Sequence, residues 1–475
     1  MSDKQLTAVH AATLIALTVL AYLEVRHHQF VWDTIPFVLE NPWVHEWSVD
    51  NVIAMFTQAH HANWHPVVLL SHALDFSLFG DDAGLHHLTN LALHVANTLL
   101  LAVLVHRLVK LTSVTDFNAR WTGFVSALIF ALHPQHVESV AWVVERKDVL
   151  YALFTLSSLI LYLHFHDRCA PGRQGRRGVH IWPFLVFCLS IAAKPMAVTF
   201  PVILLLLDIY PLNRCASVKD MARLMVEKTH YFVVAGIVML VTLTTQSTAM
   251  PDAVALPLWA RALNAIDNTL FYVTGYVWPV NLSPFYPYPQ DAACLLSPGF
   301  WLQGVLFLVT GSAISCWLFY RGIRWPLALF AFYLITLSPV SGLIHVGPAK
   351  ATDHYVYLAT VPFSILTALL LITAWNRPGL SRLLSASLGT VYLVFLLVMT
   401  QAQVSFWNNP LSLWTRVAQL YPTSPFAHRN LAAAYVQTGD HELALQHAEL
   451  SLKLGSPDIE YVERLRQSGG ATEPP

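Results

Sequence analysis

Apolar residues along this chain gather into long stretches that short polar segments separate. A helix needs roughly 20 mostly apolar residues to cross a bilayer. Eleven stretches approach that length and are predicted to span a membrane: about 6–23, 88–106, 121–138, 149–166, 181–193, 197–211, 231–248, 300–320, 325–343, 355–374 and 383–402. The fifth and sixth meet at Lys194-Pro195, where proline would break a continuous helix. A further stretch, about 266–280, carries Asn268 and several aromatic residues, so we expect an interfacial helix there.

Residues 24–87 connect the first two predicted spans and are more than a simple loop. Apolar residues recur at helical spacing over Val49–Gln58 and Pro66–Phe79. Trp47 and Trp64 lie close by, and tryptophan favours the boundary between membrane and water. We therefore predict amphipathic helices that lie on the outer leaflet and cover a cavity.

The composition is that of a polytopic membrane protein. Of 475 residues, 55% are hydrophobic and only 12% are charged, whereas soluble domains average about 25% charged residues. A formal net charge of −1 indicates no nucleic-acid partner. The five cysteines are scattered, without metal-type spacing or an evident disulfide framework. The sequence therefore predicts an all-α membrane protein.

Lys and Arg are distributed unevenly between the predicted loops, and cytoplasmic loops are usually the enriched ones. With the N-terminus inside, the inside loops hold Arg107, Lys110, Arg120, Arg168, Arg173, Arg176, Arg177, Arg214, Lys219, Arg223, Lys228, Arg321, Arg324, Arg377 and Arg382. The segment 24–87 then lies outside, with Arg26 as its only Lys or Arg. This pattern predicts about eleven spans, a first span that is retained rather than cleaved as a signal peptide, and a C-terminus on the outer side.

The chain changes character after about Val404. A pattern of small and apolar residues begins at Ala427–Tyr435 and continues through Gly439-Asp440 to Leu452. It resembles one tetratricopeptide repeat, a helical hairpin of about 34 residues. The preceding segment 411–422 resembles the second helix of a truncated earlier repeat. Because such hairpins need about three copies to bury their faces, we expect this tail to pack against the outer face of the membrane domain.

Charges within or beside a bilayer are costly, so they mark candidate functional residues. Asp33 lies among aromatic residues just after the first span, and further charges gather on the same predicted side: Glu138, Glu145, Arg146, Lys147, Asp148, Lys194, Lys350, Asp353 and His354. A carboxylate that faces several cations suits a base that activates an acceptor opposite a phosphate site, since Arg and Lys bind phosphate strongly.

Structural explanations of the same residues stay open. Asp33 could be an ordinary loop carboxylate that faces water. Residues 145–148 could form a self-neutralised loop beside lipid headgroups, and Lys194 could extend its ammonium group to the interface. His60, His61 and His65 suggest zinc, yet adjacent rings do not readily share one metal and no nearby Cys or Glu completes a four-ligand set. Packing and hydrogen bonding are the expected roles of these histidines.

Seven sequence motifs occur in an order typical of one protein family: WDTIPFVLENP, HHANWHPVVLLSHALDFSLFG, HHLTNLALHVANTLLL, FALHPQHVESVAWVVERKDVL, AKPMAVTFPVILLLLDIYPL, LSPFYPYP and DHYVYL. With the terminal repeat, they cover nearly the whole membrane domain. In these motifs the chain resembles the transmembrane and tetratricopeptide-repeat glycosyltransferases, in particular their bacterial relatives. That family belongs to the GT-C superfamily of lipid-linked-sugar transferases.

The resemblance implies a GT-C-type transmembrane domain over 1–403, with 24–87 as its first outer loop, and a periplasmic tetratricopeptide-repeat-like tail over 404–475. The implied reaction is inverting transfer of a sugar from a polyprenyl-phosphate donor to a hydroxyl of an exported protein or glycan. The implied location is the inner (plasma) membrane, with the active site and the C-terminus on the periplasmic side. The implied partners are the donor, the acceptor and membrane lipids.

The resemblance also assigns roles to residues. Asp33 occupies the family's acidic position in the first outer loop and would be the general base, which takes the acceptor proton during attack. The residues that would bind the lipid phosphate or the sugar are Arg146, Lys194, Lys350, Asp353, His354, Glu138 and His65. Neither a cofactor nor a metal ligand set is predicted from the sequence, and a divalent metal stays an open question.

Two positions depart from the family pattern. Relatives often carry two consecutive acidic residues where this chain has Asp33-Thr34, so the second carboxylate is missing or replaced by Glu40. The family's Asp-Arg-Tyr word is Asp353-His354-Tyr355 in this chain, and a histidine with a pKa near 6.5 would bind phosphate in a pH-dependent way. These departures keep two alternatives open: a catalytically reduced membrane scaffold that recruits a partner through its terminal repeat, and a lipid-linked-glycan ligase or transporter.

Overall fold

The structure of the protein is a computed structural model that describes residues 3–61, 63–112, 115–168, 181–247, 257–288, 293–344 and 349–467. Three cations of the predicted inside loops, Arg173, Arg176 and Arg177, lie outside these ranges, as do residues 468–475 of the tail. Helices account for nearly all of the regular structure that is described, which confirms the all-α class.

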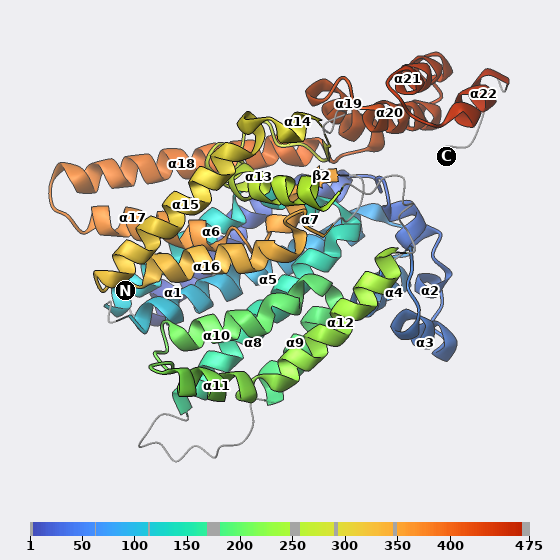
Figure 1. Cartoon of the computed structure of the whole chain (residues 1–475). Helices are drawn as coiled ribbons and strands as arrows, with labels where there is room; N and C mark the ends of the chain where they lie inside the picture. The colour runs from blue at the N-terminus through green and yellow to red at the C-terminus, as the bar shows by residue number, and fades with distance from the viewer. Residues whose placement is uncertain are drawn as a thin grey trace.

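Long helices run side by side through the body of the molecule (Figure 1). The helices that match the predicted spans are α1 (Asp3–Tyr22), α5 (Ala83–Lys110), α6 (Asp116–Ala131), α8 (Arg146–Arg168), α9 (Ile181–Ala193), α10 (Phe200–Ile209), α12 (Thr229–Ser247), α15 (Pro298–Tyr320), α16 (Trp325–Leu337), α17 (Val361–Trp375) and α18 (Leu380–Ser405). Within the described ranges, the segments built on α1, α5, α8, α15 and α18 are long and apolar enough to cross a bilayer. A pair bent by 62°, α11 (Val218–Glu227) with α12, is a sixth candidate, and the total of eleven spans stays a prediction.

The third predicted span ends earlier than its hydrophobic pattern indicates. Helix α6 stops at Ala131, because Pro134 has no amide hydrogen to donate and disfavours helical backbone at His133. The chain then turns through three short helices: η3 (Pro134–His136), α7 (Val137–Ala141) and η4 (Val143–Glu145). Every residue from Ser126 to Arg146 is buried, so this turn is part of the core and not a surface loop.

The segment between α1 and α5 forms several short helices at one end of the bundle (Figure 1). Both helices predicted there form, as α3 (Val49–Thr57) and α4 (Pro66–Phe79). Helix α4 exposes Leu74 and Leu78, so it is apolar on both faces and the amphipathic pattern predicted for it is wrong. The position of both helices on the outer leaflet stays a prediction. The other short elements are η1 (Leu23–His27), η2 (Ile35–Leu39), α2 (Pro42–His45), η5 (Pro195–Thr199), β1 (Tyr286–Pro287), α14 (Ala293–Leu296), η7 (Ser338–Val340), β2 (Ala349–Ala351) and η8 (Asp353–Val356). The stretch predicted as an interfacial helix forms the long helix α13 (Leu258–Val277), and its interfacial position stays a prediction. Strands β1 and β2 pair antiparallel, which holds the segment before η8 against the chain that follows α13.

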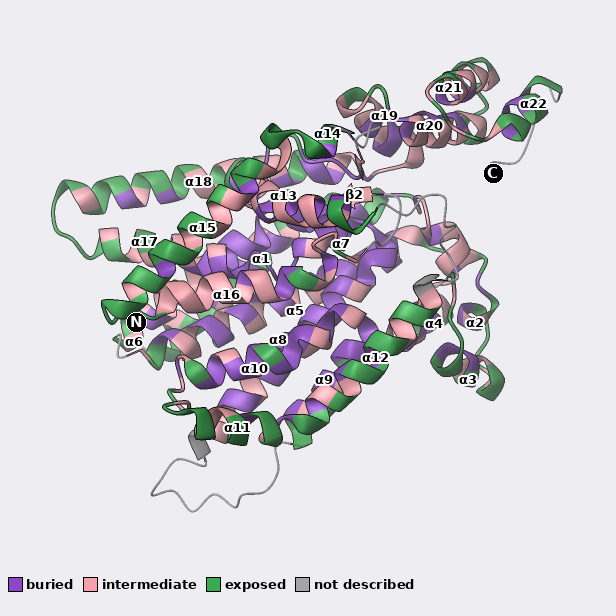
Figure 2. Ribbon diagram, in the orientation of Figure 1, coloured by how far each residue is buried: buried purple, intermediate pink, exposed green. Residues whose placement is uncertain are grey.

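Burial is highest in the middle of the bundle, and the outer helices expose apolar side chains (Figure 2). On α18, for example, Leu388 is 63% exposed and Val391 is 66% exposed. A helix that carries apolar residues on its outer face as well as its inner face is typical of a membrane span. These faces are the surface that the bundle would present to lipid.

The tail forms four helices: α19 (Pro410–Leu420), α20 (Pro425–Thr438), α21 (His441–Lys453) and α22 (Ile459–Gln467). Gly439 ends α20 with a φ of 81°, a left-handed conformation that glycine adopts without strain. Helices α20 and α21 then pack as a hairpin, whose identity as a tetratricopeptide repeat stays a prediction. The expected contact with the membrane domain is present, because the Phe426 ring stacks on Phe285 with ring centres 4.5 Å apart.

Candidate functional site

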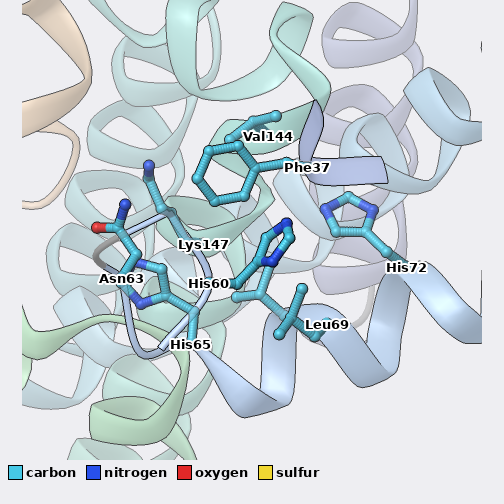
Figure 3. A pocket seen from close by; sticks show the side chains of 9 residues that line it. Phe37, His60, Asn63, His65, Leu69, His72, Val144 and Lys147 are labelled. Carbon is cyan, nitrogen blue, oxygen red and sulfur yellow. The ribbon is translucent and has the colours of Figure 1, made fainter. Parts of the chain in front are cut away.

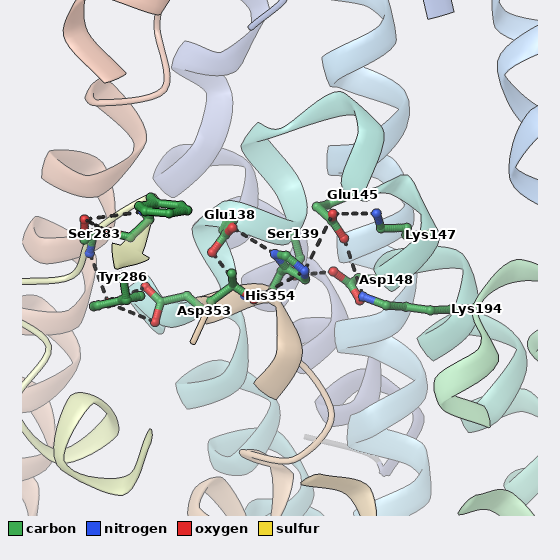
Figure 4. A network of polar contacts seen from close by, with 12 residues as sticks. Glu138, Ser139, Glu145, Lys147, Asp148, Lys194, Ser283, Tyr286, Asp353 and His354 are labelled. Carbon is green, nitrogen blue, oxygen red and sulfur yellow. Dashed lines mark hydrogen bonds and ion pairs between the residues drawn. The ribbon is translucent and has the colours of Figure 1, made fainter. Parts of the chain in front are cut away.

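Two lysines and two carboxylates meet where α8 begins and α9 ends. Lys147 Nζ lies 2.7 Å from Glu145 Oε1. Lys194, held at the helix break before Pro195, forms a close ion pair with Asp148 and lies 3.5 Å from Glu145 Oε2. Glu145 is the last residue of η4 and Asp148 lies three residues further on, in the first turn of α8. Figure 4 shows these four side chains pointing toward one another.

The carboxylates lie deeper than the lysines. The side chains of Glu145 and Asp148 are both 1% exposed, whereas that of Lys147 is 17% exposed and that of Lys194 is 6% exposed. An ammonium group carries three donors, and Glu145 is the one acceptor that Lys147 contacts within the described residues. The carboxylates therefore orient two ammonium groups that keep donors available for a ligand.

His354 connects this cluster to a second carboxylate. Its backbone N–H donates to Glu138 Oε2 at 3.1 Å, its Nδ1 lies 2.8 Å from Glu138 Oε1, and its Nε2 lies 3.7 Å from Glu145 Oε1. Burial raises the pKa of Glu138 well above its ordinary value, and burial lowers the pKa of His354 well below its own. Both directions favour the uncharged form of the two side chains.

Asp353 extends the network in the opposite direction from His354. The Tyr286 hydroxyl lies 3.2 Å from each of its carboxylate oxygens. Burial raises the pKa of Asp353 well above its ordinary value. The structure thus joins Glu138, Asp353, His354 and Lys194, four of the predicted site residues, in one polar network (Figure 4).

Arg146 points away from this network. Its side chain is fully buried, and its Nη2 lies 2.6 Å from Asp75 Oδ2 on α4. Its remaining contacts are the Asn90 side chain at 2.8 Å, the His86 carbonyl at 2.9 Å and the carbonyl and hydroxyl of Ser71 at 3.3 and 3.2 Å. Together these contacts occupy all five donors of the guanidinium. Arg146 therefore holds α4 and α5 to the start of α8, and we do not include it in the proposed phosphate site.

Lys350 is also placed apart from the other cations. Its Nζ lies 2.5 Å from Asp267 Oδ2 and between the rings of Phe271 and Phe300, at 4.9 and 4.7 Å from their centres. It does not line the cavity in front of Lys147 and Lys194. Its contacts attach β2 to α13 and α15, so it is likewise left out of the proposed phosphate site.

Asp33 follows a residue with unusual backbone geometry. Trp32 has a φ of 53°, a left-handed conformation that is rare for a bulky residue and common at functional sites when its surroundings enforce it. The Trp32 ring is held between Trp142, stacked at 4.6 Å, and Trp414 of α19, edge-on at 4.9 Å. This enclosure fixes the backbone from which the Asp33 side chain extends.

The Asp33 carboxylate makes no hydrogen bond or ion pair within the described part of the chain. Burial raises the pKa of Asp33 above its ordinary value, while the positive charge of Lys147 opposes that rise. The two side chains are therefore close enough to interact electrostatically. A carboxylate without a protein partner and with a raised pKa is suited to accept a proton from a ligand.

A cavity of about 320 Å³ lies in front of the lysines, and we call it the outer cavity. Its polar lining residues are Asn63, His65, Lys147, Lys194, Thr199, Thr242, Thr245, Ser338, His354 and Tyr355. Its apolar wall includes Trp64, Met196, Met239, Leu243 and Val340. A cavity with cations at one end and apolar walls suits a ligand that combines an anionic group with hydrocarbon.

His65 lies between the outer cavity and a much smaller one. The small cavity holds about 20 Å³, room for one water molecule, and its lining includes Phe37, His60, Asn63, His65 and Lys147 (Figure 3). Burial, together with the positive charges of Lys147 and Lys194, lowers the pKa of His65 to about 3. His65 is therefore neutral, and its buried Nδ1 has no hydrogen-bond partner among the described residues.

The described residues contain no group of three His, Cys, Asp or Glu side chains arranged to hold a metal ion. Of the neighbouring histidines, His60 has its Nε2 3.2 Å from the Pro36 carbonyl and packs edge-on against Phe37. These contacts match the packing and hydrogen bonding expected of His60.

Sequence reasoning missed Lys147 as a ligand-binding candidate. Arg146 and Lys147 are adjacent, and the arginine was the more attractive phosphate ligand because its planar donors match phosphate. In an α-helix, neighbouring residues point about 100° apart, so only one of the two can face the cavity. The signal that could have separated them is Asp75, an aspartate within an apolar helix that needs a buried cation as its partner.

No protein-family model matches the chain. The chain is 22% identical over 451 residues to protein O-mannosyl-transferase F38B6.6 of Caenorhabditis elegans, a match that covers 90% of this chain and 60% of that protein. It is 30% identical over 174 residues to protein O-mannosyl-transferase TMTC1 of Mus musculus, a match that covers 34% of this chain and 18% of that protein. The chain thus spans less than two thirds of these curated relatives.

A solved structure is similar over the whole chain. It is the oligosaccharyltransferase of Archaeoglobus fulgidus in the apo form, with a TM-score of 0.50, 12% identity, and coverage of 100% of this chain and 60% of that one. At this identity the likeness concerns the fold alone, and it confirms the GT-C-type fold expected from the sequence. The chain is therefore similar in sequence to the TMTC protein O-mannosyl-transferases and in fold to a GT-C oligosaccharyltransferase.

Proposed function

We propose that this protein transfers a sugar from a polyprenyl-phosphate donor to a hydroxyl group of an exported protein or glycan, on the outer face of the plasma membrane. The similarity to glycosyltransferases that act on proteins supports the reaction class. The observation that carries the proposal is the outer cavity, which Lys147 and Lys194 line. The Asp33 carboxylate is not one of the lining groups, but it interacts electrostatically with Lys147.

The lysines would bind the donor phosphate. Glu145 and Asp148 hold both ammonium groups at the cavity wall, so little side-chain freedom is lost when a phosphate arrives. Negative charge grows on the phosphate oxygen as its bond to the sugar breaks, and cations placed beforehand stabilise that charge. Neutral His65 at the same wall would donate a hydrogen bond to the phosphate or the sugar.

Asp33 would act as the general base. The acceptor hydroxyl oxygen attacks the anomeric carbon, the bond from that carbon to the phosphate oxygen breaks, and the acceptor proton passes to Asp33. Attack from the face opposite the phosphate inverts the anomeric centre. The products are the glycosylated acceptor and the polyprenyl phosphate, which keeps the electron pair of the broken bond.

The polar network behind the cavity would position these groups. His354 contacts both Glu138 and Glu145, and Glu145 contacts both lysines. A histidine can therefore occupy the place of the family's arginine without binding phosphate itself. In this proposal residues 1–403 form the transferase domain, and the tail 404–475 completes the site through the contact of Trp414 with Trp32.

The test is an in vitro reaction of the purified full-length protein with a polyprenyl-phosphate sugar and a serine- or threonine-containing peptide. Mannose and glucose donors are compared, and the anomeric configuration of the product is read by NMR. Transfer with inverted configuration supports the proposal. Transfer with retained configuration, or release of an oligosaccharide from a diphosphate donor instead, would refute the proposed mechanism.

A further inference from the structure

A second large cavity lies at the opposite end of the helices from the outer cavity. It holds about 690 Å³ between α5, α8, α10, α16 and α17, and we call it the inner crevice. Side chains such as Leu104, Leu156, Leu207, Leu329 and Ile365 make its walls mostly apolar. An apolar cavity costs free energy in proportion to its unfilled volume. A ligand with hydrocarbon that fills the crevice would therefore stabilise the fold.

The mouth of the inner crevice carries a cation. Arg324, the residue before α16, lines the crevice and is exposed. Its Nη1 donates to Asn213 Oδ1 at 3.0 Å, and its guanidinium lies 5.7 Å from the centre of the Phe319 ring. Within the described ranges Arg324 has no carboxylate partner. Its remaining donors are free for an anion that approaches the mouth.

Asn213 keeps this arginine in place. Asn213 adopts a φ of 51° and donates from Nδ2 to the Pro211 carbonyl at 2.8 Å, which leaves its Oδ1 facing Arg324. Asn213 follows α10 and Arg324 precedes α16, so the hydrogen bond joins the two walls of the crevice at its mouth. The cation is thereby held over the opening of an apolar space.

The nearby carboxylates are already neutralised. Asp208 pairs with Arg214 at 2.8 Å and with Lys228 at 2.6 Å, and Glu227 pairs with the same two cations at 2.7 and 3.1 Å. None of them offsets Arg324. Within the described ranges the mouth therefore has an uncompensated positive charge, and a guanidinium binds phosphate with paired hydrogen bonds.

The inner crevice is separate from the site proposed for the donor phosphate. Ser338, just after α16, lines the outer cavity, whereas Arg324 just before α16 lines the inner crevice. Thirteen helical residues lie between them, a length of roughly 20 Å. The distribution of Lys and Arg also places Arg324 on the cytoplasmic side, where the leaflet contains anionic lipids.

We propose that the inner crevice binds an anionic phospholipid, with an acyl chain between α10 and α16 and the phosphate on Arg324. This lipid site does not depend on the sugar-transfer reaction, so failure of the proposed function would leave the lipid proposal intact. The bound phospholipid would hold α10 against α16. It would thereby support the helix break at Pro195, where Lys194 lines the outer cavity.

Native mass spectrometry of the delipidated full-length protein in detergent tests this site. Dioleoylphosphatidylglycerol is titrated against dioleoylphosphatidylcholine, and one phosphatidylglycerol is expected to bind preferentially. Arg324→Gln should weaken that binding by about tenfold or more, the effect of losing a hydrogen bond to a charged group. Arg321→Gln is the matched control, because Arg321 is exposed nearby, stacks on Trp317 and does not line the crevice. Ala328→Trp, which fills the crevice, should exclude the lipid.

Equal binding of the two lipids by the wild type would overturn the proposal, as would equal loss in the Arg324→Gln and Arg321→Gln variants. Displacement of the phosphatidylglycerol by stoichiometric undecaprenyl phosphate would also overturn it, because the crevice would then hold the donor lipid. If Ala328→Trp does not fold, the two arginine variants decide.

Discussion

Trp32 stacks on Trp142 with ring centres 4.6 Å apart and planes only 6° from parallel. Trp142 belongs to the buried turn between α6 and α8, which also carries Glu138 and Glu145. The stack therefore ties the backbone before Asp33 to the residues that orient Lys147 and Lys194. Trp414 closes the other side of Trp32, so the tail is part of the same assembly.

Replacement of Trp32 should impair transfer without loss of donor binding. In Trp32→Ala the backbone before Asp33 loses the rings that enforce its left-handed conformation. We expect a transfer rate about tenfold lower, equivalent to ~1.4 kcal/mol of activation free energy, with an unchanged affinity for a short-chain polyprenyl phosphate. Trp182→Ala, on the exposed surface of α9, is the control. A Trp32→Ala rate equal to that of the control would show that the stack does not position Asp33.

Asp75 should matter for stability. Asp75→Asn leaves the buried guanidinium of Arg146 without its counter-charge, and breaking a buried ion pair costs about 3–5 kcal/mol. Thermal unfolding in detergent should therefore occur at a clearly lower temperature than in the wild type, while Asp81→Asn on the exposed turn after α4 should have little effect. If Asp75→Asn unfolds at the same temperature as the wild type, Arg146 does not anchor α8 to α4.

Lys147 should contribute directly to donor affinity. Lys147→Gln removes an ammonium group at the wall of the outer cavity, and a hydrogen bond to a charged group is worth about 1.5–3 kcal/mol. Calorimetric titration with a short-chain polyprenyl phosphate should show this weakening. Lys350→Gln is the matched control, since Lys350 pairs with Asp267 outside the cavity. Equal affinities in both variants would remove Lys147 from the phosphate site.

The helices were predictable from the sequence, whereas the directions of adjacent side chains were not. Hydrophobic stretches report span positions because lipid requires apolar surface over the whole length of a helix. The choice between Arg146 and Lys147 depends instead on Asp75, which is distant in the sequence and meets α8 only in the folded bundle. Lys350 likewise joins Asp267 through the pairing of β1 with β2, which no local pattern indicates.

Local conformation at the candidate base was also beyond sequence reasoning. The order of the family motifs predicted that Asp33 lies in the first outer loop. The left-handed backbone of Trp32 is enforced by the rings of Trp142 and Trp414, which are distant in the sequence and so gave no local signal. The end of α6 shows the opposite case. The His133-Pro134 step was visible in the sequence. The apolar residues after it suggested that the helix continues, but they are buried in the short helices of the turn and do not extend α6.

The pH dependence of transfer should follow the protonation of Asp33. A general base must be deprotonated, so the rate should fall as the pH falls through the pKa of Asp33, which burial raises above its ordinary value. Lys147 lowers this pKa by its positive charge. Lys147→Gln should therefore raise the pKa and move the acidic limb of the kcat profile to higher pH, whereas Lys350→Gln should leave it in place. A shift toward lower pH in Lys147→Gln would contradict the assignment.

The role of Asp33 as general base is tested most directly by the transfer rate of Asp33→Asn at saturating donor. The substitution keeps the size of the side chain and removes its basicity, and a general base contributes about 10²–10⁴-fold in rate. We predict a loss of that size, with a melting temperature and a polyprenyl-phosphate affinity equal to those of the wild type. Transfer by Asp33→Asn at the wild-type rate would contradict this role and leave Asp33 as an ordinary loop carboxylate.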